Sequence, residues 1–420
     1  MIPVTGTLPT RATSILQPSS SASSLLLEPM TPTPSLSPPR RSFPFLNALF
    51  AIVALYLFLC AINVMGSGLK GIGKQSDWLE TIIAQGDNPL FALFGAVLVT
   101  SIVQSSSFTT SLIITMVAAG QMPIETAVFA VMGANIGTSV TGLIVSLGTM
   151  RIRRQFRRAY SAALLHAVPN ILTVLALFPV EWITSTMFKN GQGILANTAG
   201  YIASLLGFDE VTKPTNPIKL ITKPVVGFLQ TVTEWLGGGA TIASSVLLSV
   251  VGLLLLFLAL VFLVKNLKGA VLSRLEGLFS TVFFRNDFVA WISGIFSTIS
   301  VQSSSVTTSL MVPIVGAGAV KLKRAFPFML GANIGTTVTG LIAAFANPTS
   351  AAITVAIAHV LFNCSDNLIW YPLRKIPIRI SKSYSALASR SKKWAFIFLA
   401  LVFVVVPAIG LIITEVFIYN

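Results

Sequence analysis

Charged side chains are scarce in this chain: they make up 10% of its 420 residues, against roughly 25% in ordinary soluble domains. Apolar residues reach 54%. A soluble fold of this length would have too few charges to cover its surface, which argues against a set of soluble domains. The composition indicates a polytopic membrane protein.

Cysteine and histidine are also rare, with two of each. Cys60 and Cys364 lie inside apolar runs, so we interpret them as buried free thiols and not as a disulfide or a metal site. A formal charge of +15 would by itself suggest nucleic-acid binding. The basic residues occupy short segments between apolar runs, as on the cytoplasmic side of membrane proteins, so we expect no nucleic-acid partner.

The apolar runs are long enough to cross a lipid bilayer, which takes about 20 mostly apolar residues. Five segments meet this requirement clearly: 44–66, 160–182, 242–264, 350–372 and 394–418. Two further candidates are rich in Gly, Thr and Asn: 124–148 and 325–347. Two others carry a polar block at their centre, which predicts re-entrant hairpins of two half-helices: 89–120 and 288–320.

The chain contains an internal duplication. The block QSSSFTTSL at residues 104–112 returns as QSSSVTTSL at 302–310, and GANIGTSVTG at 133–142 returns as GANIGTTVTG at 331–340. Both pairs have the same offset of 198 residues, as do the spans beginning at residues 44 and 242. Coincidence of composition does not produce two ordered motifs at one spacing.

Each repeat contains three crossings and a hairpin, so the second repeat is predicted to have inverted topology. With the N-terminus in the cytoplasm, 22 of the 28 Lys and Arg residues fall inside, in agreement with the positive-inside rule. The predicted all-α organisation is a disordered cytoplasmic tail (1–42), a transport repeat (43–187), an extracellular connector (188–240), an inverted repeat (241–373), a cytoplasmic basic loop (374–393) and an extra C-terminal span (394–420). Inverted repeats with broken helices are typical of secondary transporters.

Each Gln-Ser-Ser-Ser block is predicted to lie at a hairpin tip. A helix break there exposes backbone N–H groups, and three hydroxyls add donors, so the tip can bind an anion without Lys or Arg. The exposed carbonyl, Gln and Thr oxygens suit a small cation such as Na⁺. Ser and Thr that merely allow close helix packing are the structural alternative.

Other polar residues lie deep in predicted spans. His166 precedes Asn170 by four residues, and His359 precedes Asn363 by four, which places each pair on one helical face. A hydrogen bond that braces the motif helices, direct ion contact and pH sensing remain open for these pairs. Asp366 is a functional candidate because ionisable groups are costly in a membrane, although neighbouring polar side chains could satisfy it.

The paired Gln-Ser-Ser-Ser and Gly-Ala-Asn-Ile-Gly-Thr motifs resemble those of the type II sodium-dependent phosphate (Na/Pi) cotransporter family. The resemblance covers residues 44–372. It implies sodium-driven uptake of inorganic phosphate, with Na⁺ as the co-transported ion and no organic cofactor. It also implies a multi-pass protein of the plasma membrane, or of the inner membrane in a bacterium; a homodimer is left open.

The resemblance implies that phosphate binds to the two serine blocks, and we predict that the asparagines of the Gly-Ala-Asn-Ile-Gly-Thr motifs also bind it. The predicted phosphate ligands are Ser105, Ser106, Ser107, Ser303, Ser304, Ser305, Asn135 and Asn333. The resemblance also implies that Gln302, Thr336 and Thr339 bind sodium. To these we add their repeat mates, which are the residues at the equivalent positions of the other repeat, and the asparagines that follow the two histidines: Gln104, Thr138, Thr141, Asn170 and Asn363. Electrogenic members place an aspartate directly after the first-repeat histidine. Ala167 stands there in this chain, which leaves one sodium site in doubt.

Three other functions are compatible with parts of this pattern. A carrier of another small oxyanion would use the same motifs, and an anion channel could share the fold. An intramembrane hydrolase would pair one serine with His166 or His359, but a duplicated serine block is not what a single nucleophile and base require. We therefore predict a sodium/phosphate symporter and not an enzyme.

Overall fold

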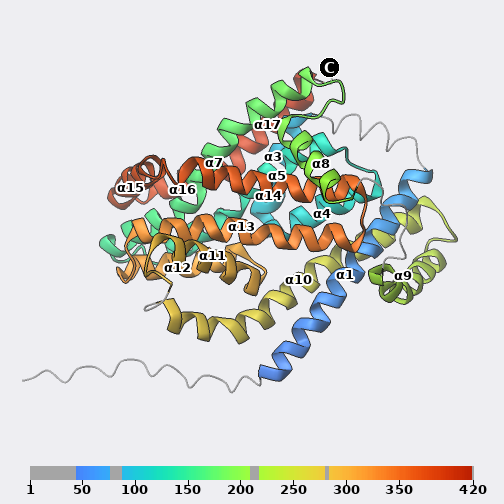
Figure 1. The fold of residues 1–420 in the computed structure, drawn as a ribbon, viewed down its shortest axis with the longest axis horizontal. Helices are drawn as coiled ribbons and strands as arrows, with labels where there is room; N and C mark the ends of the chain where they lie inside the picture. Colours follow the sequence, from blue (N-terminus) through green and yellow to red (C-terminus); the bar gives the residue numbers. More distant parts are fainter. Residues whose placement is uncertain (1–43, 76–87, 209–216, 280–282, 419–420) are drawn as a thin grey trace, which may run out of the picture. The chain divides into compact units, whose positions relative to one another are not determined.

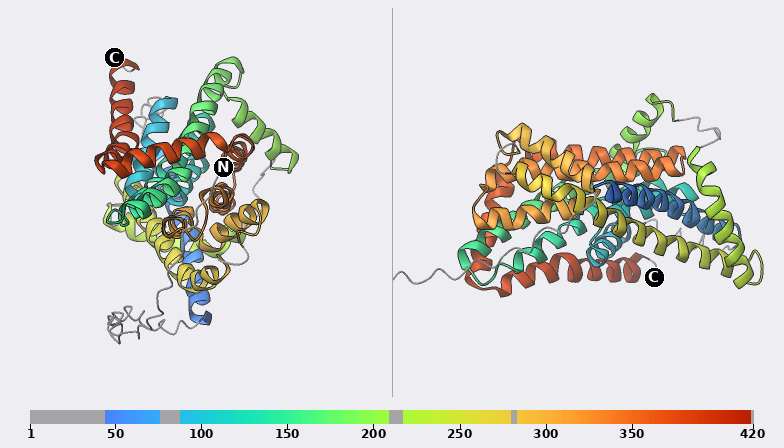
Figure 2. Two further views of the ribbon diagram at one scale, coloured as in Figure 1. Left: turned by 90° about the vertical axis from the view of Figure 1, so that its left-hand side faces the viewer. Right: turned by 90° about the horizontal axis from the view of Figure 1, so that it is seen from below.

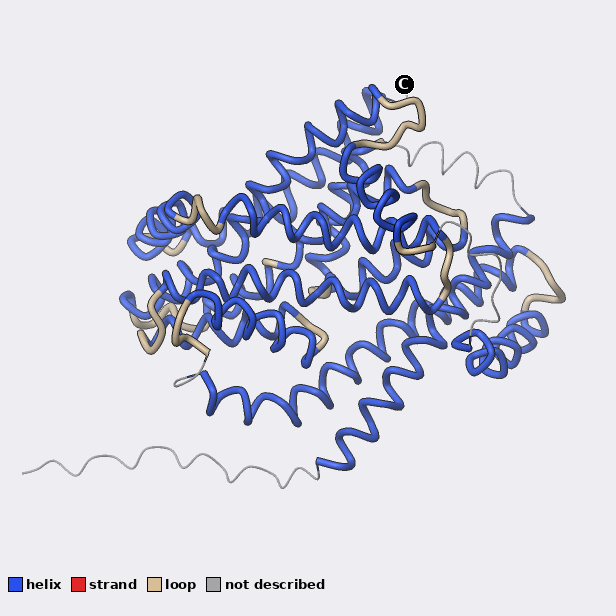
Figure 3. The backbone as a smooth tube through the Cα atoms, viewed as in Figure 1, coloured by secondary structure: helices blue, strands red, loops and turns tan. Residues whose placement is uncertain are grey.

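The computed structural model describes residues 44–75, 88–208, 217–279 and 283–418, and the tail predicted for residues 1–42 lies outside these ranges. Residues 42–420 belong to one compact unit. Within the described ranges all regular structure is helical and no strand occurs (Figure 3).

The helices recur along the chain at the spacing of the sequence repeat (Figure 1). The first series comprises α1 (Pro44–Gln75), α3 (Pro89–Val103), α4 (Ser106–Ala119), α5 (Ile124–Thr138), α6 (Val140–Leu147) and α7 (Arg153–Met187). The second comprises α10 (Ile242–Phe279), α11 (Asp287–Val301), α12 (Ser304–Ala317), α13 (Leu322–Ala346) and α14 (Ser350–Trp370). Four pairs begin 198 residues apart, which are α1 and α10, α3 and α11, α4 and α12, and α5 and α13.

The ends of the short helices follow from local sequence. Asn88 and Asn286 each cap the following helix with a side-chain oxygen, which accepts from Leu90 and Phe91 at α3 and from Val289 at α11. Gly120 and Gly318 end α4 and α12 in the left-handed conformation that glycine adopts at low cost. Helices of 14 and 15 residues result, which are too short to cross a bilayer alone.

Seven helical stretches are long and apolar enough to cross a membrane, and they correspond to the seven spans predicted from sequence. They are Ile52–Ile72, Ile124–Leu147, Arg153–Met187, Ile242–Leu263, Leu322–Ala346, Ser350–Trp370 and Lys393–Val416. The C-terminal stretch is built from α16 (Lys393–Ala400), a short π-helical turn (Leu401–Val405) and α17 (Val406–Ile418). Only 11% of the most apolar part of this stretch is buried against other helices, as expected for a helix that faces lipid. The chain is therefore a multi-pass membrane protein.

The motif glycines allow two helix pairs to pack backbone against backbone, α3 with α5 and α11 with α13. Figure 2 shows the helices from two further sides. A Cβ on Gly133 would overlap the Leu93 carbonyl, and a Cβ on Gly331 would overlap the Trp291 carbonyl. These contacts are repeat mates, since 198 residues separate each pair of positions. Small residues at such positions allow helices to approach closely in a membrane.

One segment differs from the sequence expectations. Residues 374–393, expected as a loop, contain α15 (Lys375–Arg390), whose buried face packs on α7. Buried side chains recur along it at helical spacing, at Ile378, Ser381, Ser385 and Ala388. The connector 188–240 also contains helices, α8 (Ile194–Leu205) and α9 (Pro217–Leu236).

Candidate functional site

Both serine blocks begin at a sharp break between two short helices. Gln104 separates α3 from α4 and Gln302 separates α11 from α12, each with a φ of 56°. They are the two non-glycine residues with positive φ in the described part of the chain. Such a conformation costs about 1–2 kcal/mol for a residue with a Cβ. A backbone conformation of that cost at the same place in both repeats marks the two helix breaks as a candidate functional site.

The first serine of each block starts the next helix. The Ser105 hydroxyl accepts from the Phe108 amide at 3.2 Å, and the Ser303 hydroxyl accepts from the Val306 amide at 3.3 Å. The earliest amides of α4 and α12 have no acceptor within their own helix. They add the positive end of each helix dipole to the hydroxyls nearby.

The two breaks line one cavity of about 650 Å³, although 198 residues separate them. The Ser107 hydroxyl donates to the Gln302 carbonyl oxygen at 3.4 Å, which joins one break directly to the other. Motif residues in the cavity wall are Gln104, Ser105, Ser107, Gln302, Ser303 and Ser305. The opposite wall is apolar and includes Phe257 and Leu260 of α10.

The remaining predicted ligands lie at varied distances from this cavity. Thr141 lines it, and its buried hydroxyl has no partner among the described residues. Its repeat mate Thr339 donates to Gln302 Oε1 at 2.9 Å. The other predicted ligands are absent from the cavity wall and are buried: Ser106, Ser304, Asn135, Asn333, Thr138, Thr336, Asn170 and Asn363.

None of the described residues in the cavity wall carries a formal charge. Hydroxyls, amides and helix N-termini can donate to an anion, whereas Gln oxygens, Thr oxygens and carbonyls can coordinate a cation. Ser309 also lines the cavity with a hydroxyl that is buried and without a partner among the described residues. Ser309 was not among the predicted ligands, although it stands in the repeated block seven residues after Gln302.

A second set of polar side chains connects the two repeats behind the cavity. His166 Nε2 lies 2.8 Å from Asn333 Oδ1 and donates to it. The Asn333 amide donates to Asn170 Oδ1 at 2.9 Å, and the Asn170 amide donates to the Asn135 carbonyl at 3.0 Å. The bracing role considered for His166 and Asn170 therefore exists in the structure. The partner of His166 lies on the opposite repeat, which spacing on one helix could not reveal.

The corresponding positions of α14 are arranged differently. Neither ring nitrogen of His359 has a partner among the described residues, and the same holds for Asn363 Oδ1. Asp366 is fully buried, and one of its oxygens accepts from the Thr173 hydroxyl at 2.6 Å. Its other oxygen has no hydrogen-bond partner in the described part of the chain. Thr173 and Asp366 each follow the histidine of their repeat by seven residues, so repeat mates contact one another here.

The model of the family described as Na⁺/Pi-cotransporter matches residues 57–196 and 254–387, once in each half. The chain belongs to the Na⁺/Pi-cotransporter family. Human sodium-dependent phosphate transport protein 2B is 30% identical over 434 residues, and rat sodium-dependent phosphate transport protein 2A is 31% identical over 418.

These relatives of the Na⁺/Pi-cotransporter family are longer than this chain. Both alignments include 84% of it, but they cover 63% of the human relative and 66% of the rat relative. No solved structure matches the chain. The family match confirms the resemblance that the repeated motifs carry in the sequence.

Proposed function

We propose that this protein is a sodium-coupled symporter that imports inorganic phosphate. The observation that carries the proposal is the meeting of the two Gln-Ser-Ser-Ser breaks in one uncharged cavity, joined by the Ser107 contact with Gln302. The printed names of the relatives, which are sodium-dependent phosphate transport proteins, support the same substrate and ion.

In this proposal the phosphate oxygens accept from the first amides of α4 and α12 and from the hydroxyls of Ser105, Ser107, Ser303 and Ser305. Charge-assisted hydrogen bonds of this kind are about twice as strong as neutral ones. Ser106, Ser304, Asn135 and Asn333 lie outside the cavity wall and do not contact the phosphate in this proposal.

Sodium supplies the positive charge that the cavity wall lacks. A phosphate dianion without a counter-charge would be costly in a site of low dielectric constant. Gln302 Oε1 and the Thr339 hydroxyl oxygen, which are 2.9 Å apart, offer two ligands for one ion. Thr336 lies one turn before Thr339 on α13. Gln104, Thr141 and Thr138 offer the same side-chain types in the first repeat.

Alternating access follows from the proposed inverted topology, in which α3–α4 and α11–α12 are re-entrant hairpins that enter from opposite faces. The repeats comprise residues 43–187 and 241–373, and the N-terminus lies in the cytoplasm of a plasma membrane or bacterial inner membrane. The test uses a Cys60→Ala/Cys364→Ala background with Phe108→Cys or Val306→Cys, since both positions line the cavity. Labelling by an impermeant thiol reagent should change at both positions together when Na⁺ and phosphate are added. Labelling that ignores both ligands would favour a channel.

The decisive experiment is uptake of ³²P-phosphate into proteoliposomes with an inward sodium gradient. We expect accumulation with Na⁺ and little uptake when choline replaces it. Equal uptake in the two buffers would contradict sodium coupling. Unlabelled sulfate and arsenate serve as competitors, and stronger competition by sulfate than by phosphate would identify another oxyanion as the substrate.

A further inference from the structure

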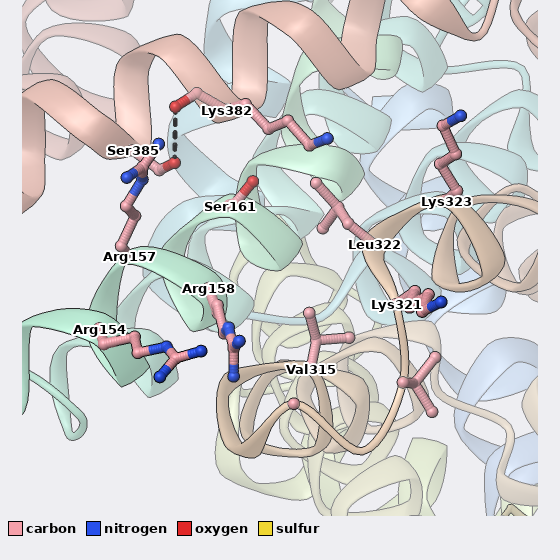
Figure 4. A pocket seen from close by; sticks show the side chains of 12 residues that line it. Arg154, Arg157, Arg158, Ser161, Val315, Lys321, Leu322, Lys323, Lys382 and Ser385 are labelled. Carbon is pink, nitrogen blue, oxygen red and sulfur yellow. Dashed lines mark hydrogen bonds between the residues drawn. The ribbon is translucent and has the colours of Figure 1, made fainter. Parts of the chain in front are cut away.

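A second cavity, of about 570 Å³, lies where α7 and α13 begin and α15 passes over them (Figure 4). Among the described residues twelve line it, of which six are basic and none is acidic. The basic residues come from three helical regions that are far apart in sequence: Arg154, Arg157 and Arg158 from α7, Lys321 and Lys323 from the start of α13, and Lys382 from α15.

These six cations are not neutralised within the described residues. None of their side chains takes part in an ion pair or hydrogen bond there, where the one ion pair joins Arg374 to Asp287. Arg324, which is adjacent in sequence but outside the cavity, does have a partner, because it donates to the Phe284 carbonyl at 3.3 Å. Six like charges gathered in one concave space repel one another, and an anion bound among them would offset that repulsion.

The helices add to this positive potential. Neither α7 nor α13 has a side-chain hydrogen bond at its N-cap, and neither has an acidic residue in its first turn. The first turns of two long helices therefore border the cavity without a side-chain cap on their amides, which adds to the positive potential there. Lys and Arg side chains are unfavourable beside the positive end of a helix dipole. A bound anion would interact favourably with the basic side chains and with the helix N-termini.

A buried hydroxyl indicates a ligand independently of the charges. Ser161 lines the cavity, is 4% exposed, and its hydroxyl has no partner in the described part of the chain. Gly318 also lines the cavity, and a Cβ there would overlap the Arg158 guanidinium. The absence of a side chain at Gly318 thus leaves room for the guanidinium.

We infer that this cavity is a binding site for a multiply phosphorylated anion, distinct from the transport cavity. Its volume suits a ligand larger than a single phosphate, and its cations span a range of helices that one phosphate could not contact together. The first repeat lacks the lysines that begin α13. The residues 198 positions before Lys321, Leu322 and Lys323 are Pro123, Ile124 and Glu125. The ligand is either a soluble polyphosphate or the headgroup of a phosphoinositide, which share the clustered phosphates recognised here.

The test measures binding directly and does not depend on transport. Purified protein is titrated with inositol hexakisphosphate by calorimetry, and protein in nanodiscs is compared with and without phosphatidylinositol 4,5-bisphosphate by thermal unfolding. The cavity variant is Arg154→Gln/Arg158→Gln/Lys323→Gln. The matched control removes three exposed charges from the same region outside the cavity, as Arg151→Gln/Arg153→Gln/Arg379→Gln.

We expect the cavity variant to lose at least about tenfold in affinity, because several charge-assisted contacts disappear, and the control to lose less than about twofold. Binding of the soluble probe alone, or of the lipid alone, would identify the source of the anion while supporting the site. Equal losses in the two variants would show that general basic charge attracts the probe and would overturn the inference. Failure of the unmodified protein to bind either probe would overturn it as well.

Discussion

The two repeats agree closely around the breaks and differ around the histidines. Gln104 and Gln302 share one backbone conformation. Gly133 and Gly331 pack against equivalent carbonyls, those of Leu93 and Trp291, on their partner helices. By contrast, His166 is hydrogen-bonded across the repeats whereas His359 has no partner among the described residues. The positions seven residues later hold Thr173 and Asp366. The duplication has kept the geometry that forms the cavity and has changed the polar network behind it.

The span that follows each break also differs. α13 continues through Thr337, whereas the equivalent helix of the first repeat is interrupted at Ser139 between α5 and α6. The Ser139 backbone amide donates to the Ile136 and Gly137 carbonyls. The Ser139 hydroxyl accepts from the Asn170 side-chain amide at 3.4 Å. Local side-chain hydrogen bonding of this kind competes with a regular helix. Since the first repeat thereby has the more irregular backbone, single changes in the two repeats need not have equal effects.

The largest effect is expected where the repeats agree most. Gly133→Ala and Gly331→Ala should each destabilise the protein by about 3 kcal/mol, because the added methyl group overlaps a backbone carbonyl that only a helix shift can relieve. Thermal unfolding in detergent measures this. Gly95→Ala is the control, since nothing lies within 4 Å of a Cβ there, and it should be neutral or slightly stabilising. Gly331→Ala with an unchanged melting temperature would refute the close packing.

Substitutions of cavity serines test whether the matched breaks act equally. Ser107→Ala and Ser305→Ala should each weaken apparent phosphate affinity by roughly 10–150-fold, the cost of about 1.5–3 kcal/mol for a hydrogen bond to a charged group. Ser106→Ala and Ser304→Ala are matched controls on the same helices, outside the cavity wall, and should change affinity far less. Uptake measured across a range of phosphate concentrations gives both values. Equal losses in all four variants would mean that the serines pack helices and do not bind phosphate.

The histidines should respond unequally. His166→Leu removes a buried hydrogen bond and leaves Asn333 Oδ1 without its donor, at a cost of about 1–3 kcal/mol. His359→Leu replaces a buried side chain that has no hydrogen-bond partner among the described residues, so stability should stay the same or rise. Unfolding of the two variants in parallel measures the difference. A larger loss from His359→Leu would show that this histidine has a ligand in the working protein.

The smallest expected effect is electrical. We expect about two sodium ions per divalent phosphate and no steady current, because two Na⁺ cancel the cost of roughly 2.3 kcal/mol per charge and 100 mV. Phosphate-evoked current under voltage clamp, together with the ²²Na:³²P flux ratio, measures the stoichiometry. Asp366→Asn should then leave the charge moved per phosphate unchanged.

A steady inward current of one charge per phosphate would contradict this expectation. If Asp366→Asn abolished such a current while uptake continued, the free oxygen of Asp366 would be the additional cation ligand. The second repeat would then supply the carboxylate that Ala167 lacks in the first. That result would make the difference between the repeats a functional one.

The sequence predicted the elements well because each depended on local properties. Hydropathy over some 20 residues located the seven candidate spans, and the polar blocks located the breaks at Gln104 and Gln302. The segment 374–393 was the main error: its high charge suggested a loop, although buried positions recur at helical spacing. A charged helix lying beside the bundle has weak hydropathy, so a search for apolar runs does not detect it.

By itself the sequence determined the all-helical membrane fold, the duplication and the residue types at the two helix breaks, because composition and helix breaks act over short stretches of chain. Only the tertiary structure decided which of those residues share a wall. Ser107 meets Gln302, His166 meets Asn333 and Thr173 meets Asp366, all across more than 160 positions. Such contacts depend on how closely helices approach, and the approach is set by glycines that pack against distant carbonyls. The gathering of basic residues from α7, α13 and α15 into one cavity has the same cause, since each helix carries its charges for local reasons and only packing brings them together.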